Sequence, residues 1–230
     1  MRFGLQKLTL LDYPGKVACT VFTAQCNLRC PFCHNADLVL ASDEELPMDS
    51  SEIMAYLRSR AKVLDGVCVT GGEPLLHKDI LDFLADIKST GLAVKLDTNG
   101  TYPGRLKTAV GEGLVDMVAM DVKNSRAKYE MTCGVSSVVD KVAESVEFLL
   151  SGKVSYEFRT TVVGSYHTPE DFLDIGTWLS GAERYYLQKF SDSGKLLAPA
   201  DGMEVSSEIM DKCLENVRLF VPCAKIRGEE

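Results

Sequence analysis

Short apolar runs alternate with amphipathic, helix-length segments along most of this 230-residue chain. This order limits the fold more than any other feature, because it is typical of βα units built on a parallel sheet. Most of the runs are apolar on both faces, as strands buried between two layers should be. The predicted strands are residues 17–23, 66–70, 93–97, 117–121, 156–163 and 185–190.

Helices are predicted between these strands, where apolar residues recur at helical spacing. Asp79 and Thr168 are suited to begin two of them, and Gly152 and Gly181 to follow the ends of two. Six βα-type units are too few for a closed eight-unit barrel, and no repeat or linker divides the chain. We therefore expect one parallel α/β domain over residues 1–230, with helices at 51–60, 79–89, 138–150, 168–181 and around Cys213.

Three cysteines, Cys26, Cys30 and Cys33, follow the first predicted strand with the spacing CxxxCxxC. A cubane iron–sulfur cluster normally takes four cysteine thiolates, one for each iron. Three thiolates leave one iron able to bind a small molecule, so the motif predicts a reactive [4Fe–4S] cluster. A structural zinc site would need a fourth ligand, and His34 is poorly placed beside Cys33 to provide one.

The rest of the sequence indicates whether there is a second cluster, in which environment the protein works and which partners it can have. None of the other five cysteines forms a second CxxC pair, so we expect no auxiliary cluster. The chain opens without an apolar signal segment, which favours a reducing cytoplasm, where disulfides are rare. A net charge of −8, a pI near 5.0 and scattered basic residues argue against binding to nucleic acid. No apolar run reaches the ~20 residues of a membrane span, so we expect no membrane partner.

Polar residues gather where the predicted strands end. Gly71-Gly72-Glu73-Pro74 follows the second strand, Asp97-Thr98-Asn99-Gly100 ends the third, and Asp121-Val122-Lys123 ends the fourth. Because chemistry in α/β barrels gathers at the carboxyl ends of the strands, these segments predict a single active site. Each has a structural alternative, namely a glycine-permitted tight turn, an Asx turn and an ordinary salt bridge.

Two further polar residues lie on the later strands. Arg159 is within the fifth and Gln188 is near the end of the sixth. A buried arginine needs a partner, and a cofactor carboxylate, Glu157 or Asp121 could provide one.

The cysteine motif, with Phe32 before its last cysteine and His34-Asn35 after it, resembles that of the radical S-adenosylmethionine (SAM) enzymes. The wider run from Leu11 to Asn35 resembles the glycyl-radical-enzyme activating proteins, and most closely the activators of anaerobic ribonucleoside-triphosphate reductase. The resemblance covers nearly the whole chain. One departure is Asp12-Tyr13-Pro14-Gly15, where many activators have Asp-Gly-Pro-Gly.

The resemblance implies a partial (β/α)6 barrel, a [4Fe–4S] cluster, SAM and a monovalent cation held by aspartates. It implies a glycyl-radical enzyme as protein substrate and a flavodoxin- or ferredoxin-type electron donor. In the family, the GGE segment meets the amino group of SAM and the lysine of Asp-x-Lys meets its carboxylate. The expected cluster ligands are Cys26, Cys30 and Cys33, and the expected cofactor contacts are Phe32, Asn35, Gly71, Gly72, Glu73, Asp97, Thr98, Asn99, Asp121, Lys123, Arg159 and Gln188.

No side chain is expected to act as a catalytic acid or base. His77 and His167 are in predicted loops with no nucleophile to pair with, so both are predicted to lie on the surface. Some activators carry a histidine after the sixth strand, where this chain has Phe190-Ser191-Asp192, so Gln188 or Ser191 could replace that contact. Three other functions stay open, namely an activator of a pyruvate formate-lyase-like enzyme, a radical SAM enzyme that acts on a small molecule, and a non-catalytic cluster carrier.

Overall fold

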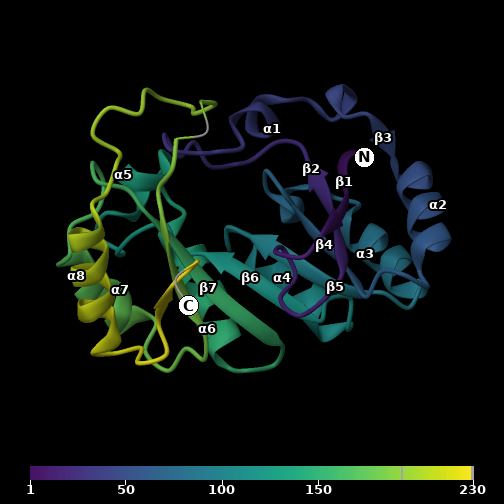
Figure 1. The fold of residues 1–230 in the computed structure, drawn as a ribbon. Coiled ribbons are helices and arrows are strands. Elements are labelled where there is room, and N and C mark those ends of the chain that lie inside the picture. Colours follow the sequence, from purple (N-terminus) through teal and green to yellow (C-terminus); the bar gives the residue numbers. More distant parts are fainter. Residues whose placement is uncertain (193, 229–230) are drawn as a thin grey trace.

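The chain folds around one sheet whose strands run mostly parallel. The strands are β1 Arg2–Thr9, β2 Ala18–Thr23, β3 Met48–Asp49, β4 Gly66–Gly71, β5 Ala93–Thr98, β6 Met117–Asp121, β7 Ser155–Val162, β8 Tyr185–Lys189 and β9 Lys225–Ile226. This computed structural model describes residues 1–192 and 194–228, and over them the strand order is β3-β1-β2-β4-β5-β6-β7-β8-β9 (Figure 1). Pairing is parallel from β2 to β9, whereas β1 is antiparallel to both of its neighbours.

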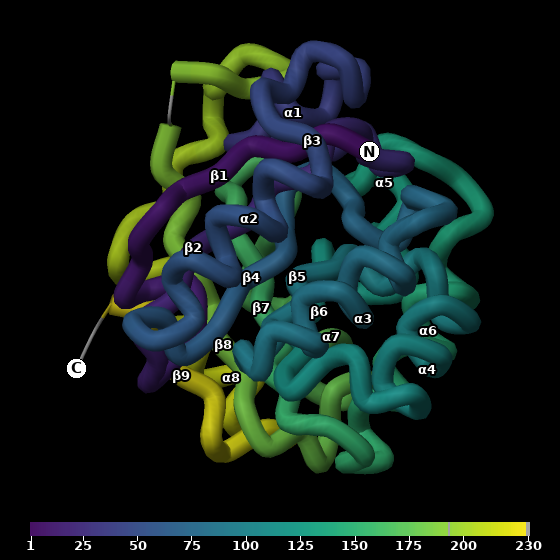
Figure 2. The backbone as a smooth tube through the Cα atoms, turned by 90° about the vertical axis from the view of Figure 1, so that its right-hand side faces the viewer, coloured from purple at the N-terminus to yellow at the C-terminus, as the bar shows by residue number. Residues whose placement is uncertain are grey.

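The helices cover the outer side of this sheet. Figure 2 shows α3, α4 and α6 following one another beside the middle strands, and α7 packs against α8 near β8. Within the described residues no helix is long and apolar enough to span a lipid bilayer. The helices are α1 Ala36–Leu40, α2 Ser50–Arg60, α3 Ile80–Ser89, α4 Pro103–Gly111, α5 Tyr129–Cys133, α6 Val139–Leu150, α7 Asp171–Trp178 and α8 Ser207–Arg218, with short 3₁₀ turns at Asp43–Glu45 and Pro74–Leu76.

The α/β fold with a mostly parallel sheet is the fold that the sequence predicted. All six predicted strands are present, with ends that differ by no more than one residue, whereas β1 and the two-residue strands β3 and β9 were missed. β1 is largely half-buried or exposed and carries Gln6 and Lys7 at exposed positions, so it lacks the apolar pattern of an inner strand. Helix α4 was also missed because it begins Pro103-Gly104, which reads as a turn.

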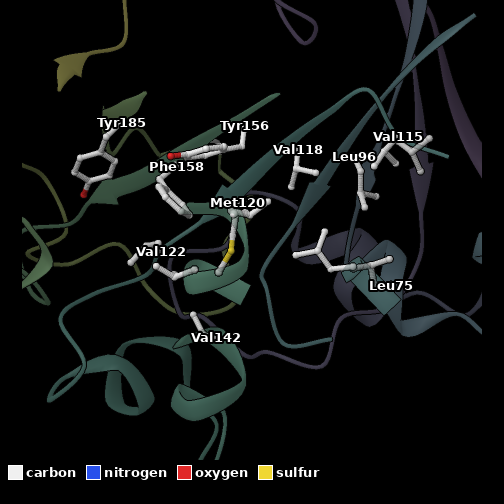
Figure 3. Close-up of a cluster of buried hydrophobic side chains, with 14 of the residues drawn as sticks. Leu75, Leu96, Val115, Val118, Met120, Val122, Val142, Tyr156, Phe158 and Tyr185 are labelled. Carbon is white, nitrogen blue, oxygen red and sulfur yellow. The ribbon is translucent and has the colours of Figure 1, made fainter. Parts of the chain in front are cut away.

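Alternate side chains of each inner strand face opposite sides of the sheet. On β6, Val118 and Met120 face the helices; Met120 lies near Phe158 of β7 and Val142 of α6, and Val118 lies near Leu96 of β5 (Figure 3). Asp121, one position on, faces the other side and lines a cavity. Strands from β4 to β8 contribute to that cavity, so the sheet curves around it as a partial barrel with β3 and β9 at its two edges.

Tyr13 fills the opposite end of this partial barrel. Its side chain is 4% exposed and packs with Ala18, Ala93 and Met117, which are the first residues of three parallel strands. A Cβ on Gly66, the first residue of β4, would lie 2.9 Å from the Tyr13 ring. The tyrosine in Asp-Tyr-Pro-Gly therefore closes the amino-terminal end of the barrel, which leaves the carboxyl ends for the site.

Candidate functional site

The three cysteines of the motif lie on residues 24–35, here called the cysteine loop, which connects β2 with α1. All three line the same cavity. Burial raises the pKa of Cys26, and it raises the pKa of Cys30 to about 12. Iron binds the thiolate form of cysteine. A bound, positively charged metal centre would therefore favour loss of the proton from these buried thiols.

Backbone contacts hold the cysteine loop in place. Gln25 has a φ of 61°, which turns the chain sharply where the loop begins, and its N–H donates to the Leu38 carbonyl at 2.7 Å. The N–H of Arg29 donates to the Cys133 carbonyl of α5 at 2.9 Å. The guanidinium of Arg29 turns back to the carbonyl of Cys26 at 2.5 Å. The loop is thus fixed at its start and in its middle, mainly by main-chain groups.

Gly71 and Gly72 bring the end of β4 against the start of the cysteine loop. A Cβ on Gly72 would lie 1.8 Å from the Gln25 carbonyl oxygen, and one on Gly71 would lie 2.3 Å from that of Thr23. Gly72 N–H donates to Thr23 at 3.0 Å, and Glu73 N–H donates to Gln25 at 2.8 Å. Only glycine fits so close an approach. These glycines line the cavity and also fix the loop that carries the cysteines.

Glu73 lies behind the cavity wall and is 0% exposed. Its Oε1 accepts hydrogen bonds from Leu75 N–H at 3.0 Å and the Thr98 hydroxyl at 2.9 Å. Its Oε2 accepts from Asn99 N–H at 2.7 Å. Burial raises the pKa of Glu73 to about 7, although the donors oppose this shift. Glu73 therefore holds the turn at residues 98–99, and its carboxylate does not line the cavity.

Five charged side chains at the ends of β5, β6 and β7 form an alternating series, here called the charge network. Arg159 is its centre, since its Nη1 donates to Asp97 at 3.0 Å and its Nε to Asp121 at 2.8 Å. Lys123 donates to the other oxygen of Asp121 at 3.0 Å. Lys95, from below, bonds the other oxygen of Asp97. In order, the network is Lys95, Asp97, Arg159, Asp121 and Lys123.

The network carries three positive and two negative charges. Burial opposes ionisation of both aspartates, but Arg159 outweighs it and holds the pKa of Asp97 and of Asp121 below its ordinary value. Burial likewise opposes the charge on Lys123, but Asp121 raises its pKa above the ordinary value. Asp97, Asp121, Lys123 and Arg159 are therefore ionised at neutral pH, and the excess positive charge of the network suits an anionic ligand group.

This arrangement resolves two alternatives left by the sequence. Arg159 pairs with Asp121 and also with Asp97, whereas Glu157 pairs with Arg227 at 2.7 Å. The four carboxylate oxygens of Asp97 and Asp121 each face a lysine or arginine nitrogen. Side chains thus neutralise the aspartates that the family resemblance associated with a monovalent cation.

The cavity has a volume of about 270 Å³ and opens at the carboxyl ends of the strands. It brings together all three cysteines and every predicted cofactor contact except Glu73. Phe32 is 4% exposed and lies 5.8 Å from the Tyr166 ring, while the Asn35 amide donates to Gly71 O at 3.3 Å. The lining residues are Cys26, Leu28, Cys30, Phe32, Cys33, His34, Asn35, Val39, Thr70, Gly71, Gly72, Asp97, Thr98, Asn99, Asp121, Lys123, Arg159, Thr161 and Gln188.

Some site residues escaped sequence reasoning. Thr161 lines the cavity because it is two positions after Arg159 on the same strand face, and strand alternation could have identified it. Thr70, near the end of β4, also lines the cavity, and the same alternation could have identified it. Lys95 lies two positions before Asp97 and belongs to the network, but a lysine within an apolar run gives no signal of its own.

The prediction that the two loop histidines lie on the surface was wrong. His167 is 3% exposed, and its Nδ1 accepts from Val163 N–H at 3.1 Å while its Nε2 donates to the Lys123 carbonyl at 2.8 Å. His77 is 9% exposed and its Nε2 lies 2.9 Å from the Ala24 carbonyl. Both rings satisfy backbone groups of loops that border the cavity, which is why they are buried.

The donor set fits an iron–sulfur cluster and a bound anionic group. Cys133 is buried beside the cysteine loop, but its thiol is directed to the carbonyls of Glu130 and Val135, at 3.7 and 3.4 Å. Among residues 1–192 and 194–228, no group of three or more His, Cys, Asp and Glu side chains converges as a site for one metal ion.

A known protein family matches most of this chain. The model of the radical SAM superfamily matches residues 20–179, which include the cysteine loop and β4 to β7. A protein of Methanocaldococcus jannaschii, provisionally named a glycyl-radical enzyme activating enzyme, is 31% identical over 197 residues, which are 81% of this chain and 78% of that protein. The chain belongs to the radical SAM superfamily.

Other relatives share only part of their length with this chain. A provisionally named GTP 3′,8-cyclase of Pyrococcus abyssi is 32% identical over 127 residues, which are 54% of this chain and 40% of that protein. Streptococcus suis SuiB bound to S-adenosylmethionine superposes with a TM-score of 0.68 at 12% identity, over 90% of this chain and 49% of SuiB. A domain of pyruvate-formate lyase-activating enzyme from Bacteroides vulgatus superposes with a TM-score of 0.54 at 20% identity, over 71% of this chain and 99% of that one. At these identities the two structures support the fold alone.

Proposed function

We propose that this protein is a radical SAM activating enzyme that produces a glycyl radical on a partner enzyme. The observation that carries the proposal is the single cavity that joins three cysteines to the charge network. The similarity to the M. jannaschii protein extends over 81% of the chain and supports the activase class. The finer proposal, from the motif resemblance, is that the partner is anaerobic ribonucleoside-triphosphate reductase.

A bound [4Fe–4S] cluster and SAM would supply the radical chemistry: one electron would break the bond between sulfur and C5′ and give methionine and a 5′-deoxyadenosyl radical, which would take a hydrogen atom from glycine Cα and leave as 5′-deoxyadenosine. The residues of the chain bind and orient these groups. Cys26, Cys30 and Cys33 would hold the cluster. Lys123 and Arg159 present positive charge to the carboxylate of SAM, and Phe32 offers an apolar wall that excludes water. A flavodoxin- or ferredoxin-type protein would supply the electron.

Anaerobic reconstitution with iron and sulfide, followed by reduction with dithionite in the presence of SAM, tests the chemistry. We expect 5′-deoxyadenosine from the wild type and none from Cys30→Ala. Cys223→Ala is the matched control, because Cys223 is exposed and does not line the cavity. Absence of 5′-deoxyadenosine from the wild type, or its formation by Cys30→Ala, would contradict the proposal.

The partner is tested by adding a candidate glycyl-radical enzyme to the reduced mixture. We expect an EPR doublet from the glycyl radical, and chain cleavage of the partner when air is admitted. If 5′-deoxyadenosine forms but none of the candidates gives the doublet, a small-molecule substrate becomes the better assignment, as in the cyclase relative. A protein that transfers its cluster to acceptors and shows no spectral change with SAM would instead be a carrier.

A further inference from the structure

One member of the charge network does not reach the cavity. Lys95 lies on β5 two positions before Asp97, so its side chain faces the same side of the sheet from one layer deeper. Its side chain is 1% exposed, and it is absent from the cavity lining. Its ammonium group bonds Asp97 and lies 3.8 Å from the thiol sulfur of Cys68, its neighbour across the β4–β5 pairing.

A lysine at this position is unfavourable for folding alone. Moving an ammonium group out of water costs on the order of several kcal/mol, and replacing a whole buried ion pair by apolar side chains is often neutral or stabilising. The residues paired with Lys95 on the two neighbouring strands are Cys68 and Met117, which are 0% and 6% exposed and carry no charged group. The burial of a positive charge directly beneath the cavity therefore calls for a role beyond packing.

The charge count of the network gives such a role. Without Lys95, the charges of Asp97 and Asp121 would cancel those of Arg159 and Lys123. With Lys95, one positive charge is in excess. Glu157 does not remove it, because that carboxylate is paired with Arg227. Glu73 and Asp12 bond only neutral donors and lie outside this series. Both are the same in every variant of Lys95 and Asp97, so they do not alter the charge differences between those variants.

We propose that Lys95 is a positioning residue that sets the affinity of the cavity for the carboxylate end of SAM. It holds Asp97 from below, so that Asp97 does not fully neutralise Arg159. The positive charge of Arg159 and Lys123 is then left for the ligand. This inference rests on the proposed function, because it takes SAM to be the ligand.

Variants that change the charge count test this role. The wild-type network has an excess of +1, Lys95→Met has 0, Lys95→Met with Asp97→Asn returns to +1, and Asp97→Asn alone has +2. Dissociation constants would be measured by anaerobic calorimetry on reconstituted protein, for SAM and for 5′-methylthioadenosine. The second compound keeps the adenosine and the sulfur but lacks the amino-acid end.

We expect Lys95→Met to weaken SAM binding about tenfold, which is the order of effect of one charge acting through a partly buried ion pair. Binding of 5′-methylthioadenosine should not change. The double variant should regain most of the lost affinity, and Asp97→Asn alone should bind SAM more tightly than the wild type. Lys88→Met is the control, because it removes a lysine from a partly exposed pair with Asp116 at 2.8 Å outside the cavity.

Three results would overturn the role of Lys95: unchanged SAM affinity in Lys95→Met, equal weakening for both ligands, or a double variant as weak as the single. If Lys95→Met does not fold, the role of Lys95 is tested by comparing the SAM affinities of Asp97→Asn, the wild type and the double variant. Asp97→Asn that binds SAM no more tightly than the other two would contradict it. A wild-type protein that binds neither ligand would instead contradict the proposed function.

Discussion

The cysteine loop and the charge network face each other across one cavity, but they are held by different forces. The loop is fixed by main-chain contacts, such as the bond from Glu73 N–H to Gln25 O at 2.8 Å and the close approach of Gly72. The network is fixed by side-chain charges, with Arg159 bonded to two carboxylates at 3.0 and 2.8 Å. The cysteine loop depends on glycines, which have no side chain, and the charge network depends on charged side chains.

The two regions should therefore fail separately. An added methyl group at the loop displaces backbone and leaves the charges of the network in place. A charge removed from the network leaves an unpaired ion in a buried position, where the desolvation penalty is no longer offset. Damage to the cysteine loop should therefore reduce iron binding, and damage to the charge network should destabilise the ends of the strands.

Arg159→Met should give the largest loss of stability. The substitution leaves Asp97 and Asp121 without their shared partner, and loss of one partner from a buried ion pair typically costs about 3–5 kcal/mol. Urea unfolding monitored by circular dichroism would measure it. Lys107→Met is the control, since it removes an exposed pair with Glu144 and should cost about 1 kcal/mol or less. A loss for Arg159→Met no larger than that of the control would show that charge does not hold this region.

Gly72→Ala should damage the cysteine loop. Its Cβ would meet the Gln25 carbonyl at 1.8 Å, so the loop must move, and overpacking of this kind costs about 1–3 kcal/mol. We expect iron bound per chain after reconstitution to fall sharply. Gly104→Ala is the control, because Gly104 lies in α4 with open space around it and should gain roughly 0.5–1 kcal/mol. Normal iron content in Gly72→Ala would break the distinction between the two regions.

The same distinction explains what the sequence could predict. The cysteine loop is encoded by neighbouring residues, so the spacing of Cys26, Cys30 and Cys33 indicated it directly. The strands were predicted where both faces are buried, and β1 was missed because its middle is exposed. Positions at strand ends were predicted because parallel strands bring their carboxyl ends to one edge.

The pairing within the network could be predicted only in part: Asp121 was one of three candidate partners for Arg159, and Asp97 was not among them. Arg159 is 62 positions from Asp97 and 38 from Asp121 in the chain, and their contact depends on the order in which β5, β6 and β7 pair. His167 illustrates the same limit. Its ring reaches the Lys123 carbonyl 44 positions away, so that a residue in a loop becomes buried.

His167→Phe should loosen the network side of the cavity by a smaller amount. Phenylalanine keeps the ring, which lies 5.8 Å from Phe172, but leaves Val163 N–H and the Lys123 carbonyl without this partner. Unsatisfied buried groups cost about 1–2 kcal/mol. Urea unfolding would measure the loss, and iron content should stay at the wild-type value. Lower iron content with unchanged stability would assign His167 to the loop instead.

Glu73 joins the two regions, and its titration gives the smallest effect. Burial raises its pKa from 4.5 to about 7, so between these pH values the folded protein holds a proton that the unfolded chain has released. Its contribution to the free energy of unfolding is thus complete below about pH 4.5 and is lost as the pH rises through about 7. Asp97 and Asp121 have lowered pKa values, so their contribution is lost only as the pH falls below 3.8.

Glu73→Gln isolates this contribution because an amide does not titrate in the range. The difference between wild type and variant should change by about 1 kcal/mol per pH unit or less between pH 5 and 7, with the wild type losing stability relative to the variant. His167, whose pKa burial lowers, acts in the opposite direction but is present in both proteins and cancels. A difference that grows in favour of the wild type as the pH rises would mean that the hydrogen bonds from Thr98 and Asn99 outweigh burial. Glu73 would then belong with the charges of the network.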